Sequence, residues 1–107
     1  MTESEFLDLA ERTLDAIEAA VEAAPIDAEV TRAGNVLTLE LADGSRVVIN
    51  SQAPMQQLWV AARSGGFHYE RREGEWRDTR DGTELFAALS RILSAQGGSP
   101  VLLRPRS

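Results

Sequence analysis

Five acidic residues recur along the N-terminal segment at steps of three and four positions: Asp8, Glu11, Asp15, Glu18 and Glu22. On an α-helix this spacing places the carboxylates within about 80° of arc, so they form one acidic stripe. Carboxylates are hard oxygen ligands, suited to calcium, magnesium, manganese or iron. The chain has one histidine and no cysteine, too few ligands for a closed transition-metal cage. Any metal binding here is therefore expected to be weak, exposed and poorly selective.

Two interpretations of the acidic stripe lead to different functions. It is either an ordinary solvated helix face or a surface for cations or a basic partner. Like charges three or four residues apart cost about 0.2–0.5 kcal/mol per pair, and Arg12 is the only base among them. We predict that this repulsion is nowhere relieved and that the stripe is functional. Asp27 and Glu29 follow closely and are expected to extend it.

The net charge is unevenly distributed along the chain. Residues 1–29 carry nine acids and one arginine, whereas residues 30–107 carry eight acids and ten arginines. An acidic end attracts cations or a basic protein and repels nucleic acid, so nucleic-acid binding is not expected. The chain has no apolar run long enough to span a membrane and no N-terminal signal pattern. With the absence of cysteine, this predicts a cytoplasmic protein.

No pattern in the chain indicates catalysis. His68 is the only histidine, so no distinctive triad spacing exists, and paired carboxylates are too common among 17 acids to indicate a glycosidase. The chain also lacks a glycine-rich phosphate loop. We therefore predict no catalytic residue and no organic cofactor.

The elements that position these residues follow from the apolar periodicity. Thr2 and Glu5 have capping-box spacing, and apolar residues every three or four positions predict a helix over about residues 4–23, ended by Pro25. Alternating segments at 26–31, 36–41, 46–50, 58–61, 67–70 and 75–77 predict antiparallel strands. A second helix is expected from a cap at Asp81 to Gly97 and Gly98, with the apolar tail 101–103 between the helices. The prediction is an α+β fold in one domain, 1–107: a two-layer sandwich with both helices on one face of a five- or six-stranded antiparallel sheet.

Trp59 alternates with the apolar residues Leu58 and Val60. If these two face the helices, Trp59 lies on the opposite, open face of the sheet; the inverted register would make it a core residue. On the open face it would lie beside amide side chains and His68, as an interface anchor.

Several short segments follow one another along the chain: Ser4-Glu5-Phe6, Asn35-Val36-Leu37-Thr38-Leu39, DGSRVVIN from Asp43, PMQQLWVA from Pro54, GGFHY from Gly65 and EWRD from Glu75. In this order they resemble the segments of bacterial members of the frataxin family. The resemblance covers essentially the whole chain and is most specific between Asn50 and Trp59 and between Gly65 and Tyr69.

The resemblance implies a frataxin α-β sandwich with a role in iron–sulfur cluster assembly. It implies weak, carboxylate-bound iron and partners in the cysteine desulfurase and the iron–sulfur scaffold protein, with a regulatory effect on the desulfurase. Together with Asp15 from the spacing, the candidate metal ligands are Glu11, Asp15, Glu18, Glu22, Asp27 and Glu29. The implied partner-binding residues are Asn50, Gln52, Gln57, Trp59 and His68.

The chain departs from the family pattern near the end of the first helix. Familiar bacterial members have paired acids and a longer acidic loop there, whereas this chain reads Glu18-Ala19, Glu22-Ala23 and a short Ala24-Pro25-Ile26. We therefore expect the acidic stripe to be a docking surface for a basic partner rather than a strong iron site. The protein is expected to be a monomer, and the formation of metal-dependent oligomers stays open. Two alternatives also stay open: a ferroxidase-like enzyme, and an acidic interaction module with incidental metal binding.

Overall fold

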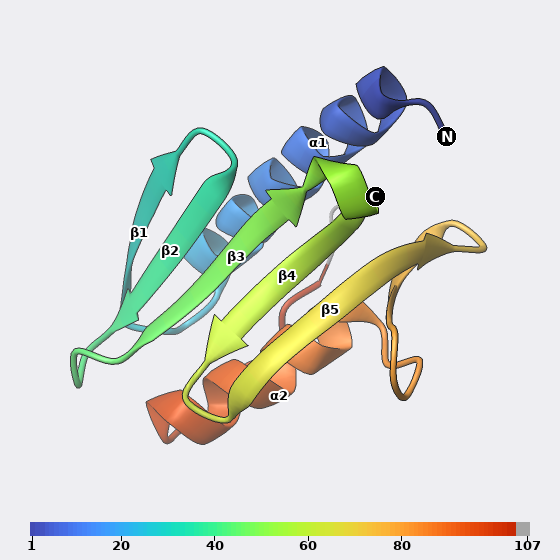
Figure 1. Ribbon diagram of the computed structural model, residues 1–107. Coiled ribbons are helices and arrows are strands. Elements are labelled where there is room, and N and C mark those ends of the chain that lie inside the picture. The colour runs from blue at the N-terminus through green and yellow to red at the C-terminus, as the bar shows by residue number, and fades with distance from the viewer. Residues whose placement is uncertain (105–107) are drawn as a thin grey trace.

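The computed structural model describes residues 1–104, which form two α-helices and a six-stranded antiparallel sheet (Figure 1). Both helices lie on one face of the sheet, which confirms the predicted two-layer α-β arrangement. We call the other face the open face. Neither helix in the described part of the chain is long and apolar enough to cross a membrane.

Helix α1 (Glu3–Ala23) begins at the predicted capping box. The backbone N–H of Glu5 donates to Thr2 Oγ1 (3.1 Å), and the backbone N–H of Thr2 donates to the Glu5 carboxylate (2.8 Å). These hydrogen bonds, the backbone one first, lower the pKa of Glu5. The helix ends before Pro25, and its core-facing residues recur with helical period: Phe6, Ala10, Thr13, Leu14, Ile17, Ala20 and Val21.

The sheet is a meander in which each strand pairs with the next. Its strands are β1 (Ala28–Ala33), β2 (Val36–Leu41), β3 (Arg46–Gln52), β4 (Gln57–Ala62), β5 (Gly65–Arg72) and β6 (Glu75–Asp78). A short 3₁₀ turn, η1 (Ala53–Met55), contains Pro54 and separates β3 from β4. The first strand begins two residues later than predicted, because the N–H of Ile26 donates to the carbonyl of Ala24 (2.8 Å) and turns the chain there.

The face of the sheet toward the helices supplies a large part of the hydrophobic core. Alternate residues of the strands are buried there, as a period of two requires: Leu37, Leu39, Leu41, Val47, Ile49, Leu58, Val60, Tyr69 and Trp76. Trp76 is 3% exposed and joins the sheet to α1. Its ring meets that of Phe6 edge-on at 6.1 Å, and its indole N–H donates to Thr13 Oγ1 at 3.0 Å.

Helix α2 (Leu85–Gly97) is capped by a different residue from the one predicted. The carboxylate of Glu84 accepts hydrogen bonds from the backbone N–H groups of Phe86 and Ala87, so Glu84 and not Asp81 is the N-cap. Asp81 instead accepts from the N–H of Thr83 within the preceding turn, and that hydrogen bond lowers its pKa. The prediction failed because Asp81 and Glu84 carry similar carboxylates and both precede the apolar run.

The tail after α2 is held by serine side chains of that helix. The N–H of Val101 donates to Ser94 Oγ and the N–H of Leu103 donates to Ser90 Oγ, both at 2.8 Å. Val101 and Leu103 are buried, while Leu102 lines a hollow beside the end of α1. The tail thus packs against both helices, as predicted.

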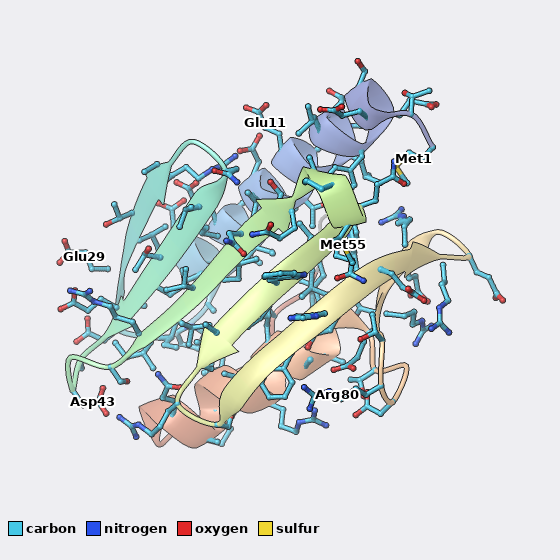
Figure 2. All side chains as sticks on the ribbon, in the orientation of Figure 1. Met1, Glu11, Glu29, Asp43, Met55 and Arg80 are labelled. Atoms are coloured by element: carbon cyan, nitrogen blue, oxygen red, sulfur yellow. The ribbon has the colours of Figure 1, made fainter. Side chains whose placement is uncertain are left out.

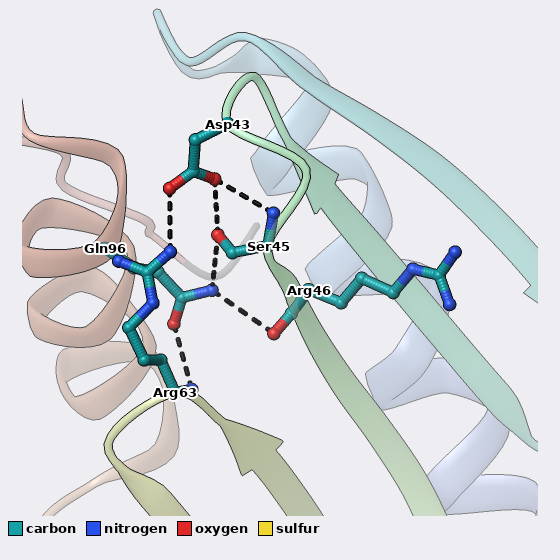
Figure 3. Close-up of polar contacts among 5 residues, drawn as sticks. All are labelled: Asp43, Ser45, Arg46, Arg63 and Gln96. Atoms are coloured by element: carbon teal, nitrogen blue, oxygen red, sulfur yellow. Dashed lines mark hydrogen bonds and ion pairs between the residues drawn. The ribbon is translucent and has the colours of Figure 1, made fainter.

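One corner of the molecule is tied together by polar side chains from three elements (Figure 3). Asp43, in the β2–β3 turn, accepts from Ser45 and from the guanidinium of Arg63 (2.7 Å), which follows β4. Hydrogen bonds, first from the Ser45 side chain and then from Arg63, hold the pKa of the Asp43 carboxyl below its usual range. Gln96 of α2 donates to Ser45 Oγ and to the carbonyl of Arg46. This network links α2 to two turns of the sheet.

Candidate functional site

The acidic stripe lies along the side of α1 that faces away from the buried residues. Asp15 is 65% exposed and Glu18 is 33% exposed, whereas Leu14 and Ile17, each next to one of them in sequence, are buried. Glu11 and Glu22 are exposed as well, one turn or more to either side. The spacing therefore brings these carboxylates to one accessible helix face, as predicted.

The prediction that repulsion within the stripe is nowhere relieved is wrong. Arg12 Nη2 contacts Asp8 Oδ2 at 3.0 Å on the helix itself. From strand β1, Arg32 Nη1 donates to Asp15 Oδ1 at 2.8 Å and lies 3.8 Å from Glu18 Oε1. Helical spacing shows only which charges lie on the same helix. The contact with Arg32, which lies on a neighbouring strand, could therefore not be predicted from it.

The two acids expected to extend the stripe lie elsewhere. Asp27 precedes β1 and lines a hollow against the end of α2. Glu29 lies in β1 and pairs in register with Glu40 of β2. Since Arg32 points toward α1 and strand residues alternate between faces, Glu29 faces the opposite way, onto the open face. Figure 2 shows Glu29 at the outer edge of β1, apart from Glu11 on α1.

The six candidate metal ligands consequently do not converge. Within residues 1–104, no three histidine, cysteine, aspartate or glutamate side chains gather closely enough to hold a metal ion. The arrangement suits a solvated cation shared by one or two carboxylates rather than a closed site.

The five candidate partner-binding residues, in contrast, come together on the open face. Asn50, Trp59 and His68 are neighbours across β3, β4 and β5, and Gln52 and Gln57 are neighbours in the next row. Leu58 and Val60 are buried against the helices. The register therefore places Trp59 on the open face and excludes the inverted register, in which Trp59 would be a core residue.

Trp59 and His68 form the centre of this surface. Their rings stack with centroids 4.3 Å apart and planes 9° from parallel, and the indole N–H of Trp59 donates to Gln57 Oε1 at 2.9 Å. A shallow hollow lined by Val48, Asn50 and the two rings lies beside the stack. A flat aromatic pair bordered by amides is a typical protein contact surface.

The arginines near β5 and β6 make contacts within the chain. Arg72 pairs with Glu70, and Arg77 pairs with Glu75. Arg77 also donates to the carbonyl of Gly82 at 3.1 Å, and the guanidinium of Arg71 lies 5.5 Å from the ring centroid of Trp76. These contacts account for Arg71, Arg72 and Arg77 without an external ligand.

Comparisons with known proteins agree on one family. Residues 1–99 match the family model described as a frataxin-like domain. Among curated relatives, the iron–sulfur cluster assembly protein CyaY of Janthinobacterium sp. (strain Marseille) is 59% identical over 97% of both chains. The protein of the same name from Cupriavidus taiwanensis is 62% identical over 92% of this chain and 93% of its own.

Solved structures give the same result. The frataxin from Psychromonas ingrahamii superposes with a TM-score of 0.88 at 34% identity, over 95% of this chain and 97% of that chain. A trimeric frataxin from the yeast Saccharomyces cerevisiae, complexed with ferrous iron, has a TM-score of 0.67 at 31% identity, over 92% and 88% of the two chains.

Proposed function

The chain belongs to the frataxin family, and from this premise we propose that it is a non-enzymatic accessory protein of iron–sulfur cluster assembly. It docks on the cysteine desulfurase through the acidic stripe of α1 and regulates the output of that enzyme in the cytoplasm. The observation that carries the docking proposal is the exposed row of carboxylates on α1, for which residues 1–104 supply counterions only in part. A basic partner surface would supply the remaining positive charge.

A second contact is proposed on the open face, where the iron–sulfur scaffold protein would meet Asn50, Gln52, Gln57, Trp59 and His68. The stacked rings of Trp59 and His68 support this assignment, because aromatic groups bordered by polar ones are frequent anchors of interfaces. The acidic stripe and the open face belong to different layers of the molecule. Two partners could therefore bind the protein at the same time.

Iron is proposed as cargo, held weakly by exposed carboxylates of the stripe and by Asp27 and Glu29. The described acids fit this role only in a limited sense, since no three of them gather around one point within residues 1–104. No observation favours the ferroxidase-like alternative, which would need carboxylates preorganised around iron. The other alternative, an acidic interaction module with incidental metal binding, predicts that iron leaves the α1 amides unperturbed.

The docking proposal is tested by titrating the protein with the cysteine desulfurase at low salt. Glu11→Arg and Glu22→Arg, each at an exposed stripe position, are expected to weaken binding about tenfold or more. Glu40→Arg, in β2 on the open face, produces the same change in net charge and is expected to bind nearly as the wild type does. Absence of binding by the wild type, or equal effects of all three substitutions, would contradict the proposal.

The iron proposal needs a separate experiment. Anaerobic titration with Fe²⁺, followed by amide NMR shifts, should perturb α1 before it perturbs β5 or β6. Unmoved α1 amides, together with a clear response to the desulfurase, would instead support the acidic interaction module.

A further inference from the structure

Arg32 is held in a defined orientation between β1 and α1. Its Nε donates to the carbonyl of Gly34 at 2.9 Å, and its Nη1 donates to Asp15 Oδ1 at 2.8 Å. The Arg32 side chain is only 19% exposed, although Asp15 is 65% exposed. The guanidinium is thus anchored at the strand turn on one side and at the helix on the other.

This anchoring places a positive charge between two carboxylates of the stripe. Glu18 Oε1 lies 3.8 Å from the same Nη1 atom that binds Asp15. A metal ion or a partner's basic side chain that bridges Asp15 and Glu18 would need the space that Arg32 already fills. The planar guanidinium is fixed by its bond to Gly34, so it gives up little additional freedom in holding both acids.

The two flanking acids are in a different situation. Glu11 and Glu22 take part in no ion pair in the described portion of the chain, residues 1–104. Asp8 pairs with Arg12 on the helix itself, and Arg32 supplies a counterion at the centre of the stripe. Within residues 1–104, Glu11 and Glu22 are therefore the stripe positions without one.

We propose that Arg32 is an internal counterion that competes with external cations for Asp15 and Glu18 and so weakens cation binding at the centre of the stripe. The inference rests on the proposed function, in which the stripe receives metal ions and basic side chains. It adds that the capacity of the stripe for cations is set by a residue outside α1. Any ligand that occupies the centre must first displace Arg32.

The matched control is Arg46 in β3. This arginine is exposed, lies 3.7 Å from Glu40 and belongs to the row of the open face that also holds Glu29. Arg32→Gln and Arg46→Gln change the net charge equally, so long-range electrostatics are matched. Only Arg32→Gln removes a charge that contacts α1.

The experiment uses Mn²⁺ alone as a paramagnetic probe of the ¹⁵N-labelled chain at low salt. In the wild type, broadening is expected to be weaker at the amides of residues 15–18 than near Glu11 and Glu22. Arg32→Gln should extend the broadening to residues 15–18 and tighten Mn²⁺ binding about two- to fivefold, the range of an exposed ion pair. Arg46→Gln should leave the broadening of the α1 amides as it is in the wild type.

Three results would overturn the proposal: identical broadening in wild type and Arg32→Gln, an equal gain in Arg46→Gln, or no broadening of α1 in Arg32→Gln. If Arg32→Gln unfolds, Arg32→Lys replaces it. Lysine keeps the charge but cannot reproduce the fixed fork, so an intermediate gain is expected and no gain would contradict the inference. This experiment contains no desulfurase, so its result does not depend on docking. A failure of the docking proposal and a failure of this inference are therefore distinguishable.

Discussion

Replacing Glu22 by alanine is expected to stabilise the protein, although it removes a charged surface residue. Glu22 lies in the last turn of α1, which contains no basic residue, and the helix dipole disfavours an anion there by about 0.3–1 kcal/mol. Glu18 is four residues away, and relief of that like-charge pair contributes about 0.2–0.5 kcal/mol. Alanine also has a slightly higher helix propensity than glutamate. We expect the free energy of unfolding to rise by about 1 kcal/mol.

Replacing Glu18 by alanine should behave differently, because Arg32 lies beside it. The same relief of repulsion is gained, but an attraction at 3.8 Å to a largely buried arginine is lost. Partly exposed ion pairs contribute about 0.2–1 kcal/mol, so the two effects nearly cancel. The free energy of unfolding is expected to stay within about 0.3 kcal/mol of wild type.

Urea unfolding of both variants at low salt measures this difference, and thermal unfolding should show a rise of about 4–8 °C for Glu22→Ala. Repeating the measurement in about 0.5 M NaCl should reduce the gain, since exposed charges are screened over a few ångströms at that ionic strength. A fall in stability for Glu22→Ala would mean that Glu22 is structural. Equal stabilisation by both substitutions would show that Arg32 contributes nothing at Glu18.

Three further predictions concern the aromatic residues. Trp59→Ala should weaken binding to the iron–sulfur scaffold protein about tenfold or more with little change in melting temperature, whereas Trp59→Phe keeps a ring against His68 and should lose less; equal binding by all three proteins would remove Trp59 from the interface. Trp76→Phe removes the hydrogen bond to Thr13 and should cost about 1 kcal/mol of unfolding free energy, a loss that a Thr13→Val background should reduce if the bond is its cause. Burial raises the pKa of Tyr69 to about 12, and because an unfolded tyrosine ionises near about 10, the stability that this shift contributes is complete below that pH and is lost as the pH rises toward 12. Tyr69 is the only tyrosine, so absorbance at about 295 nm follows it alone, and a midpoint near that of the urea-unfolded chain would refute the shift.

The local elements of the fold were readable from the chain because each has a short-range cause. The capping box at Thr2, the stop at Pro25 and the two-residue turns between strands involve residues close in sequence. The cap of α2 was harder, because Asp81 and Glu84 are both suitable carboxylates before the same apolar run. Only the backbone geometry shows which of them meets the helix N–H groups.

The candidate surfaces likewise combine features that local sequence predicts with features that only the strand register shows. Alternation with Leu58 and Val60 was enough to favour Trp59 on the open face, and the strand register then placed His68 directly beside it. Only that register brings the two rings together, since they are nine positions apart in the sequence and a turn lies between them. The opposite placement of Glu29 also follows from register, because one strand presents its odd and even residues to opposite faces.

The sequence by itself determined the acidic helix face, the two-layer fold and the family, because periodicity and local motifs encode them directly. Only the tertiary structure decided how much of that acidic charge is free. Arg32 reaches Asp15 from a strand 17 residues further along the chain, and no helical spacing predicts which strand lies beside a helix. Electrostatic neutralisation depends on distance in space rather than in sequence. The acids of the stripe could therefore be counted from the sequence, whereas the counterion from the neighbouring strand could be identified only in the structure.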